Sequence, residues 1–144
     1  MKILDTNAVN YVLKNRLTLG DDYCVTDDIK EEIEIAEAVI GSRLSSKVMP
    51  ASDSPLFDRA LYLAHYKNML NKHGGRSFYR MSGFGDISIL ALLKTVEEVS
   101  TNQARGRLFS TDEDLEVFTE DQPLIKKIKK ESTKTKILKN TNVK

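Results

Sequence analysis

The stretch Lys2-Ile3-Leu4-Asp5-Thr6-Asn7 decides the fold of this chain, because it joins a short apolar strand to an aspartate and two small polar residues. In an open parallel sheet, ligands bind at the carboxyl ends of the strands. Asp5 is expected to lie at such an edge. The function of the protein therefore depends on whether other carboxylates reach the same edge.

The composition indicates one globular, water-soluble domain of 144 residues, with 40% hydrophobic and 30% charged residues. No apolar run approaches the roughly 20 residues that cross a membrane, and the apolar start of the chain is too short for a secretory signal. The single cysteine, Cys24, excludes an internal disulfide and favours a reducing compartment, so we expect a cytoplasmic protein. Without a Cys/His cluster, a structural zinc site is not expected.

Short apolar strands alternate with helices along the chain. The spacing of apolar residues, together with caps and glycines, defines the expected elements. Strands are expected at 3–4, 23–25, 47–49, 107–110 and 135–138, and helices at 7–14, 27–40, 56–73, 87–98 and 124–130. This alternation predicts an α/β fold, with three α/β/α layers around a central, mostly parallel sheet.

Lysines dominate the C-terminal segment, although the formal net charge of the chain is only +1. From residue 126 to the C-terminus there are eight lysines and one acid. Such a block is typical of nucleic-acid binding, and it fits a solvated tail or a charge-protected strand edge about equally well. We therefore divide the domain into a core of about 1–122 and a lysine-rich helix, strand or tail over 123–144.

Two parts of the chain are candidates for contact with RNA. Lys126 and Lys127 begin the lysine-rich block. Arg76 and Arg80 lie in a glycine-rich connector in which cations are mixed with aromatic rings, as in loops that bind RNA. A solvated loop with buried rings is the alternative interpretation of the connector.

Five carboxylates follow predicted strands or lie in the first two turns of predicted helices: Asp5, Glu32, Asp86, Asp112 and Asp114. In a parallel sheet, strand ends and helix starts meet at one edge. Converging carboxylates repel one another and are costly to desolvate, so such a group persists when a cation neutralises it. Because the ligands are all oxygens, the expected ion is Mg²⁺ or Mn²⁺. Such an ion can activate a water to attack a phosphodiester.

The same carboxylates, in the same order, resemble the motifs of the PIN-domain ribonucleases over roughly residues 1–118. Asp5-Thr6-Asn7 is similar to the opening motif, and Glu32 to the glutamate of the second. Asp86, which follows Gly83-Phe84-Gly85 and precedes an apolar helix, is similar to the third. Leu108-Phe109-Ser110-Thr111-Asp112-Glu113-Asp114 resembles the fourth, with Ser110 at the hydroxyl position and Leu115 where an aromatic residue is usual.

The second motif leaves three glutamates open, Glu31, Glu32 and Glu34. We place the family's acid at Glu32, because the apolar Ile33 follows it.

The resemblance implies a three-layer PIN-like domain that cuts RNA with Mg²⁺ or Mn²⁺. It implies that the catalytic metal ligands are Asp5, Glu32, Asp86 and Asp112, that Asp114 is a further ligand, and that Thr6, Asn7 and Ser110 orient waters or carboxylates. A chain of this length also resembles the toxin half of VapC-type toxin–antitoxin pairs. That likeness implies an antitoxin protein and a homodimer as partners.

Two other functions stay open at this point. A non-catalytic PIN-like module would bind RNA or protein through the lysine-rich segment and would need no metal ion. A phosphatase of the haloacid dehalogenase type would use Asp5 as its nucleophile. That family needs an acid two residues later, where this chain has Asn7, and the full set of acids favours the nuclease.

Overall fold

The centre of the fold is a parallel sheet. The structure, a computed structural model, describes residues 1–40, 48–73, 84–105 and 115–143. The sheet has 5 strands: β1 (Lys2–Leu4), β2 (Tyr23–Val25), β3 (Met49–Pro50), β4 (Glu116–Phe118) and β5 (Lys136–Leu138). They lie in the order β3-β2-β1-β4-β5, and each of these neighbouring pairs is parallel. The α/β class predicted from the sequence is confirmed.

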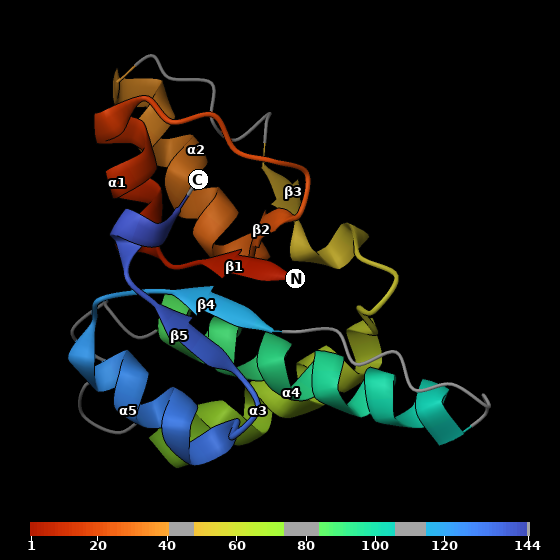
Figure 1. The fold of residues 1–144 in the computed structure, drawn as a ribbon. Coiled ribbons are helices and arrows are strands. Elements are labelled where there is room, and N and C mark those ends of the chain that lie inside the picture. Colours follow the sequence, from red (N-terminus) through yellow and green to blue (C-terminus); the bar gives the residue numbers. More distant parts are fainter. Residues whose placement is uncertain (41–47, 74–83, 106–114, 144) are drawn as a thin grey trace.

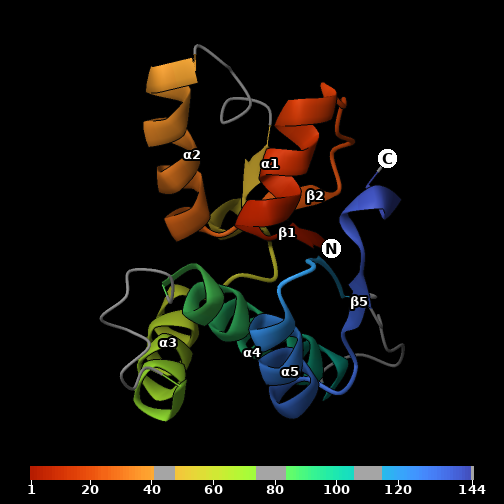
Figure 2. The ribbon, with the colours of Figure 1, turned by 90° about the vertical axis from the view of Figure 1, so that its left-hand side faces the viewer.

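Helices cover both faces of this sheet, which gives three α/β/α layers (Figure 1). On one face lie α1 (Thr6–Asn15) and α2 (Asp27–Ile40); on the other lie α3 (Arg59–His73), α4 (Phe84–Arg105) and α5 (Gln122–Glu131). Two short 3-10 helices, η2 (Ala51–Asp53) and η4 (Asn140–Asn142), follow β3 and β5. Figure 2 views the layers from the side on which α1 and α5 begin.

The middle of the sheet consists of strands that are apolar along their length. Ile3 and Leu4 of β1 are fully buried, and so are Cys24 and Val25 of β2. Strands covered on both faces are expected to carry continuous apolar runs rather than alternating ones. β1 lies between β2 and β4, with Leu4 opposite Phe118. The order of strands reverses between β1 and β4, which makes their carboxyl ends the switch point where such sheets bind ligands.

The central helix of the second face, α4, is buried on most sides, as its sequence predicted. Ile89, Leu90 and Leu92 are fully buried, and α4 packs against α3, α5 and α2. The helix begins at Phe84 and ends at Arg105, so it extends beyond the predicted 87–98 at both ends. Asp86 lies in its first turn, as the sequence predicted.

The start of α3 and the position of the fourth strand also differ from the sequence prediction. α3 begins at Arg59 rather than at residue 56, because Asp58 caps the start of the helix: its Oδ1 accepts a hydrogen bond from the backbone N of Leu61 at 3.0 Å. The strand beside β1 is β4, at Glu116–Phe118. The predicted strand at 107–110 lies outside the described residues.

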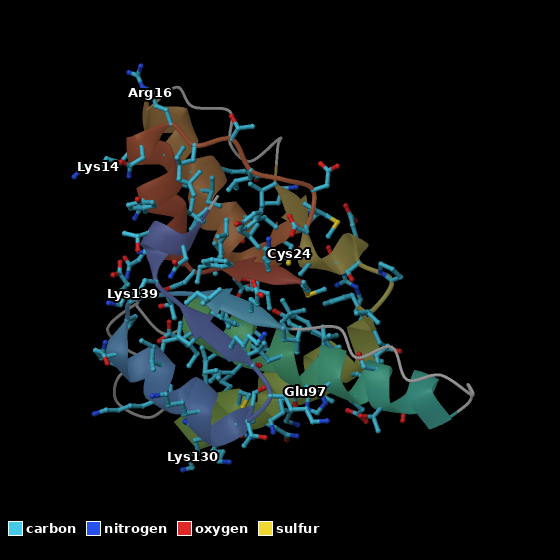
Figure 3. The ribbon with its side chains drawn as sticks, viewed as in Figure 1. Lys14, Arg16, Cys24, Glu97, Lys130 and Lys139 are labelled. Carbon is cyan, nitrogen blue, oxygen red and sulfur yellow. The ribbon has the colours of Figure 1, made fainter. Side chains whose placement is uncertain are left out.

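The lysine-rich segment forms α5, β5 and η4, and β5 is an edge strand beside β4, as the sequence predicted. Leu124 and Ile128, on one side of α5, are completely buried. Its lysines lie mostly on the other side, and Figure 3 shows Lys130 and Lys139 directed away from the body of the protein. The segment is thus built into the sheet and the second helical layer.

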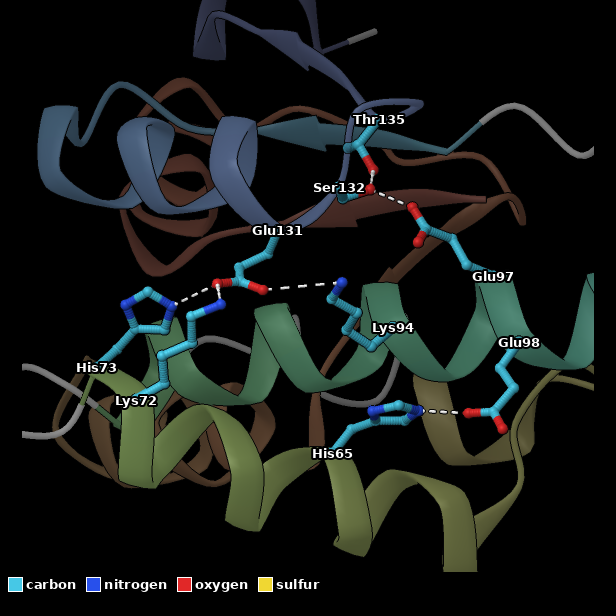
Figure 4. A network of polar contacts seen from close by, with 9 residues as sticks. All are labelled: His65, Lys72, His73, Lys94, Glu97, Glu98, Glu131, Ser132 and Thr135. Atoms are coloured by element: carbon cyan, nitrogen blue, oxygen red, sulfur yellow. Dashed lines mark hydrogen bonds and ion pairs between the residues drawn. The ribbon is translucent and has the colours of Figure 1, made fainter.

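A polar network holds the C-terminal end of α5 against α3 and α4 (Figure 4). Glu131 is buried, and one carboxylate oxygen lies 2.6 Å from Nζ of Lys72 and 2.9 Å from Nε2 of His73. Its other oxygen lies 3.7 Å from Nζ of Lys94. Burial favours the neutral acid, but the hydrogen bonds from Lys72 and His73 outweigh it and lower the pKa of Glu131. This network fixes the direction of α5.

Candidate active site

Asp5 follows β1 and is the buried centre of the candidate site. It is only 4% exposed. Its Oδ1 accepts a hydrogen bond from the backbone N of Thr6 at 2.7 Å, which makes Asp5 the N-cap of α1. Its Oδ2 accepts one from Oγ1 of Thr119 at 2.8 Å. Burial raises the pKa of Asp5 in spite of these two hydrogen bonds, which act in the opposite direction.

Thr119 and Asp121 follow β4, and neither was predicted from the sequence as a site residue. Thr119 is 1% exposed, and its Oγ1 accepts a hydrogen bond from the backbone N of Asp121 at 3.1 Å. Asp121 in turn is the N-cap of α5, where its side chain accepts from the backbone N of Leu124 at 3.5 Å. The hydroxyl of Thr119 thus links the acid after β1 to the acid after β4.

A signal for these two residues exists in the sequence. Thr119-Glu120-Asp121 is a Thr-x-Asp sequence directly after an apolar strand, and Pro123 marks the start of a helix. Ser110-Thr111-Asp112, nine residues earlier, also has a hydroxyl residue two positions before an aspartate. The prediction used that earlier sequence instead.

Glu32 reaches the site from α2. Its Oε2 accepts a hydrogen bond from Oγ1 of Thr6 at 3.0 Å. Glu31 instead adds to the negative charge around Asp28. Among the glutamates left open by the sequence, Glu32 is therefore the one that the structure places beside Thr6.

The start of α4 packs closely against Glu32 and Thr6. A Cβ built on Gly85 would lie 3.8 Å from Oγ1 of Thr6 and 4.0 Å from Oε1 of Glu32. These are ordinary contact distances, so Gly85 brings the backbone of α4 to the edge of the site. The neighbouring Asp86 is carried there with it.

Two buried hydroxyls join the start of α2 to the start of α4. Oγ of Ser88 donates to the carbonyl of Gly85 at 2.7 Å, so Oγ1 of Thr26 must donate to Ser88 in the 2.7 Å contact between them. Thr26 also accepts from the backbone N of Ile29 at 3.3 Å, near the beginning of α2. This chain of hydrogen bonds holds the helices that carry Glu32 and Asp86 in one arrangement.

Asp86 has the most perturbed carboxyl of the site. Burial, followed by repulsion from Asp121, Asp5 and Glu32, raises the pKa of Asp86 to about 7. Lys127 opposes this rise, with its Nζ 3.9 Å from Oδ2 of Asp86. Repulsion from Asp121 and Glu32 also contributes to the raised pKa of Asp5. The four carboxylates therefore interact with one another, although they come from four separate segments of the chain.

The other predicted site residues are distributed as follows. Asn7 lies in α1 and is exposed, and Lys126 is exposed on α5. The predicted residues Arg76, Arg80, Ser110, Asp112 and Asp114 lie outside the described residues. Within the described ranges, no three His, Cys, Asp or Glu side chains are grouped closely enough to form a ready-made metal cage.

Comparisons with protein-family models, with curated proteins and with solved structures found no match to this chain. Among the helices in the described part of the chain, none has the length and apolar character needed to cross a bilayer.

Proposed function

We propose that this protein is an endoribonuclease that depends on Mg²⁺ or Mn²⁺ and cleaves RNA phosphodiesters. Asp5, Glu32, Asp86 and Asp121 would hold the metal. Asp112 and Asp114 stay predictions from the sequence. We give the fourth position to Asp121, because it follows the strand that pairs with β1.

One observation carries the proposal. Burial, together with repulsion from the carboxylates of Asp121, Asp5 and Glu32, raises the pKa of Asp86 to about 7 where segments from β1, α2, α4 and the end of β4 meet. Such an arrangement costs stability in the absence of a cation. Perturbed carboxylates at the switch point of a parallel sheet are typical of a functional site.

The donor atoms of these residues suit a hard dication, which would have to draw the carboxylates closer together than they lie here. All four side chains offer carboxylate oxygens, and Thr6 and Thr119 contribute hydroxyls that orient Glu32 and Asp5. Oxygen ligands of this kind favour Mg²⁺ or Mn²⁺ over softer metals. When bound, the ion would supply an activated water and offset the charge that develops on the phosphate.

The chain's own residues would prepare the site for that chemistry. Thr119 holds Asp5 in one orientation, and the hydroxyls of Thr26 and Ser88 fix the spacing between α2 and α4. When these side chains are already in position before the substrate binds, less free energy is needed to arrange them in the transition state.

The direct test is incubation of a mixed pool of single-stranded RNA with and without Mn²⁺. We expect cleavage only with the metal, and a loss of about a hundredfold or more in Asp5→Asn, Asp86→Asn and Asp121→Asn. Glu32→Gln and Glu34→Gln form a matched pair, because both glutamates lie on α2 and only Glu32 is bonded to Thr6. Full activity in Asp5→Asn and Asp86→Asn would refute the assignment.

A non-catalytic module that binds RNA or protein is the second candidate, and the exposed lysines of α5 favour it. Calorimetric titration with Mn²⁺ separates the two functions. A nuclease of the proposed kind must bind the ion, whereas a binding module need not.

The toxin role implied by the resemblance extends the proposal to a partner. An antitoxin would silence the acidic site with a basic group, and the active form would be a homodimer. We expect expression of the wild-type chain, but not of Asp5→Asn, to stop growth of a bacterial host. Equal growth of the two strains would remove the toxin role without touching the nuclease assignment.

A further inference from the structure

Lys127 places its ammonium beside Asp86, one of the four carboxylates of the candidate site. Its side chain is 25% exposed, and its Nζ is 3.9 Å from Oδ2 of Asp86, whose side chain is 14% exposed. Charge-assisted hydrogen bonds between ammonium and carboxylate are normally about 2.7–2.9 Å long. The ammonium and the carboxylate therefore attract each other, but at this distance they form no direct hydrogen bond.

The packing of α5 directs Lys127 toward α4. Leu124, Ile128 and Glu131 are buried on one side of the helix, and the spacing of three and four residues places Lys127 on that same side. Glu131 faces Lys94 of α4 one turn further on, so two ion pairs of opposite polarity connect the helices. Figure 4 shows how Glu131 anchors this end of α5.

Lys127 and a dication compete for the same carboxylate. Asp86 is stabilised by Lys127 in the free protein, because the ammonium offsets part of the repulsion from Asp5 and Asp121. Once Asp86 ligates a dication, Lys127 faces positive charge and is repelled. Its long and flexible side chain can then reach a different anion nearby.

We propose that Lys127 is a substrate-binding residue, which pairs with Asp86 in the metal-free protein and with an RNA phosphate once Asp86 ligates a dication. The inference rests on the proposed function, since it needs both the metal and the RNA. It gives Lys127 a role different from that of Lys126, whose side chain is exposed on the same helix.

The test compares Lys127→Met with Lys67→Met, which removes the same charge from an exposed position on α3. Calorimetry with MnCl₂ measures metal affinity, and steady-state cleavage of a fluorescent single-stranded RNA in Mn²⁺ gives KM and kcat. We expect Lys127→Met to bind Mn²⁺ about fivefold more tightly and to raise KM about tenfold or more. Lys67→Met should change neither value.

The opposite directions of these two effects separate the proposal from a merely structural role. A variant that only disturbed the packing of α5 would weaken metal binding and cleavage together. Unchanged or weaker Mn²⁺ binding by Lys127→Met would overturn the proposal that Lys127 changes partner from Asp86 to an RNA phosphate. An unchanged KM would overturn it as well.

Two further variants keep the test decisive. Lys127→Arg retains the charge and should keep the Mn²⁺ affinity of the wild type. Lys127→Gln replaces the Met variant if that one does not fold.

The wild type distinguishes failure of this proposal from failure of the proposed function. If the wild type binds Mn²⁺ but cleaves no RNA, the proposed function fails and calorimetry alone decides whether Lys127 competes with the ion at Asp86. If the wild type binds no Mn²⁺, both proposals fall.

Discussion

Oγ1 of Thr119 donates a hydrogen bond to Oδ2 of Asp5 at 2.8 Å, although 114 residues separate them. Both side chains are almost completely buried. The contact joins the end of β1 to the end of β4, the two strands on either side of the switch point of the sheet. The orientation of Asp5 therefore depends on Thr119, in the segment that follows β4.

Replacement of Thr119 by Val removes the hydroxyl but keeps the shape of the side chain. The buried Asp5 then loses a donor and the backbone N of Asp121 loses an acceptor. We expect the free energy of unfolding to fall by about 1–3 kcal/mol. Urea denaturation measures the change, with Thr119→Ser as the control that keeps the hydroxyl. Equal stability of the two variants would show that the bond contributes little.

Asp86 should make the protein less stable as the pH rises. In the unfolded chain an aspartate ionises near pH 4, whereas its pKa in the folded protein is about 7. The folded state therefore binds more protons between these values, and this contribution to stability is lost as the pH rises from about 4 to about 7. Melting temperatures across this range should fall relative to those of Asp86→Asn.

Added Mn²⁺ should reverse this pH effect, because metal ligands must be deprotonated. We expect the ion to raise the melting temperature of the wild type more at pH 8 than at pH 5, and to leave that of Asp86→Asn nearly unchanged. A metal effect that is the same at both pH values would contradict the role of Asp86.

Glu131→Gln tests the anchor of α5. The amide keeps the shape but loses the charge that faces Lys72, His73 and Lys94. We expect a loss of about 1–3 kcal/mol in the free energy of unfolding at neutral pH. The pKa of Glu131 is lowered on folding, so its contribution is present above the unfolded value and is lost as the pH falls. The gap between wild type and variant should close in acid.

Glu98→Gln is the matched control for that measurement. Glu98 lies on the neighbouring α4 and pairs with His65, but its side chain is 42% exposed. Surface ion pairs contribute little, so we expect a change below about 0.5 kcal/mol. A larger effect in Glu98→Gln than in Glu131→Gln would contradict the importance of the anchor.

Local sequence predicted most of the fold because local physics determines it. Three elements are defined without help from the rest of the chain. They are β2 by its apolar run Tyr23–Val25, α2 by its cap and the acids in its first turn, and α5 by the buried stripe of Leu124 and Ile128. The parallel sheet followed from their alternation. Asp5, Glu32 and Asp86 were named for the same reason, since each lies at a strand end or near a helix start.

The fourth strand could not be placed in this way. Phe109-Ser110-Thr111-Asp112 and Phe118-Thr119-Glu120-Asp121 have the same pattern of an aromatic residue, a hydroxyl and an acid. Only pairing with β1 distinguishes them, and in the structure Leu4 lies opposite Phe118. Strand register is a property of the assembled sheet. Thr119 and Asp121 were therefore not predicted from the sequence, and neither was the contact of Lys127 with Asp86.

The central position of β1 has a consequence for protein synthesis. β1 leaves the ribosome well before β4, its neighbour on one side, because 114 residues separate Asp5 from Thr119. A nascent chain therefore holds Asp5 without Thr119 or Asp121 until the segment after β4 has been made. The carboxylates can meet only after that point, so no product that ends before β4 carries the assembled site.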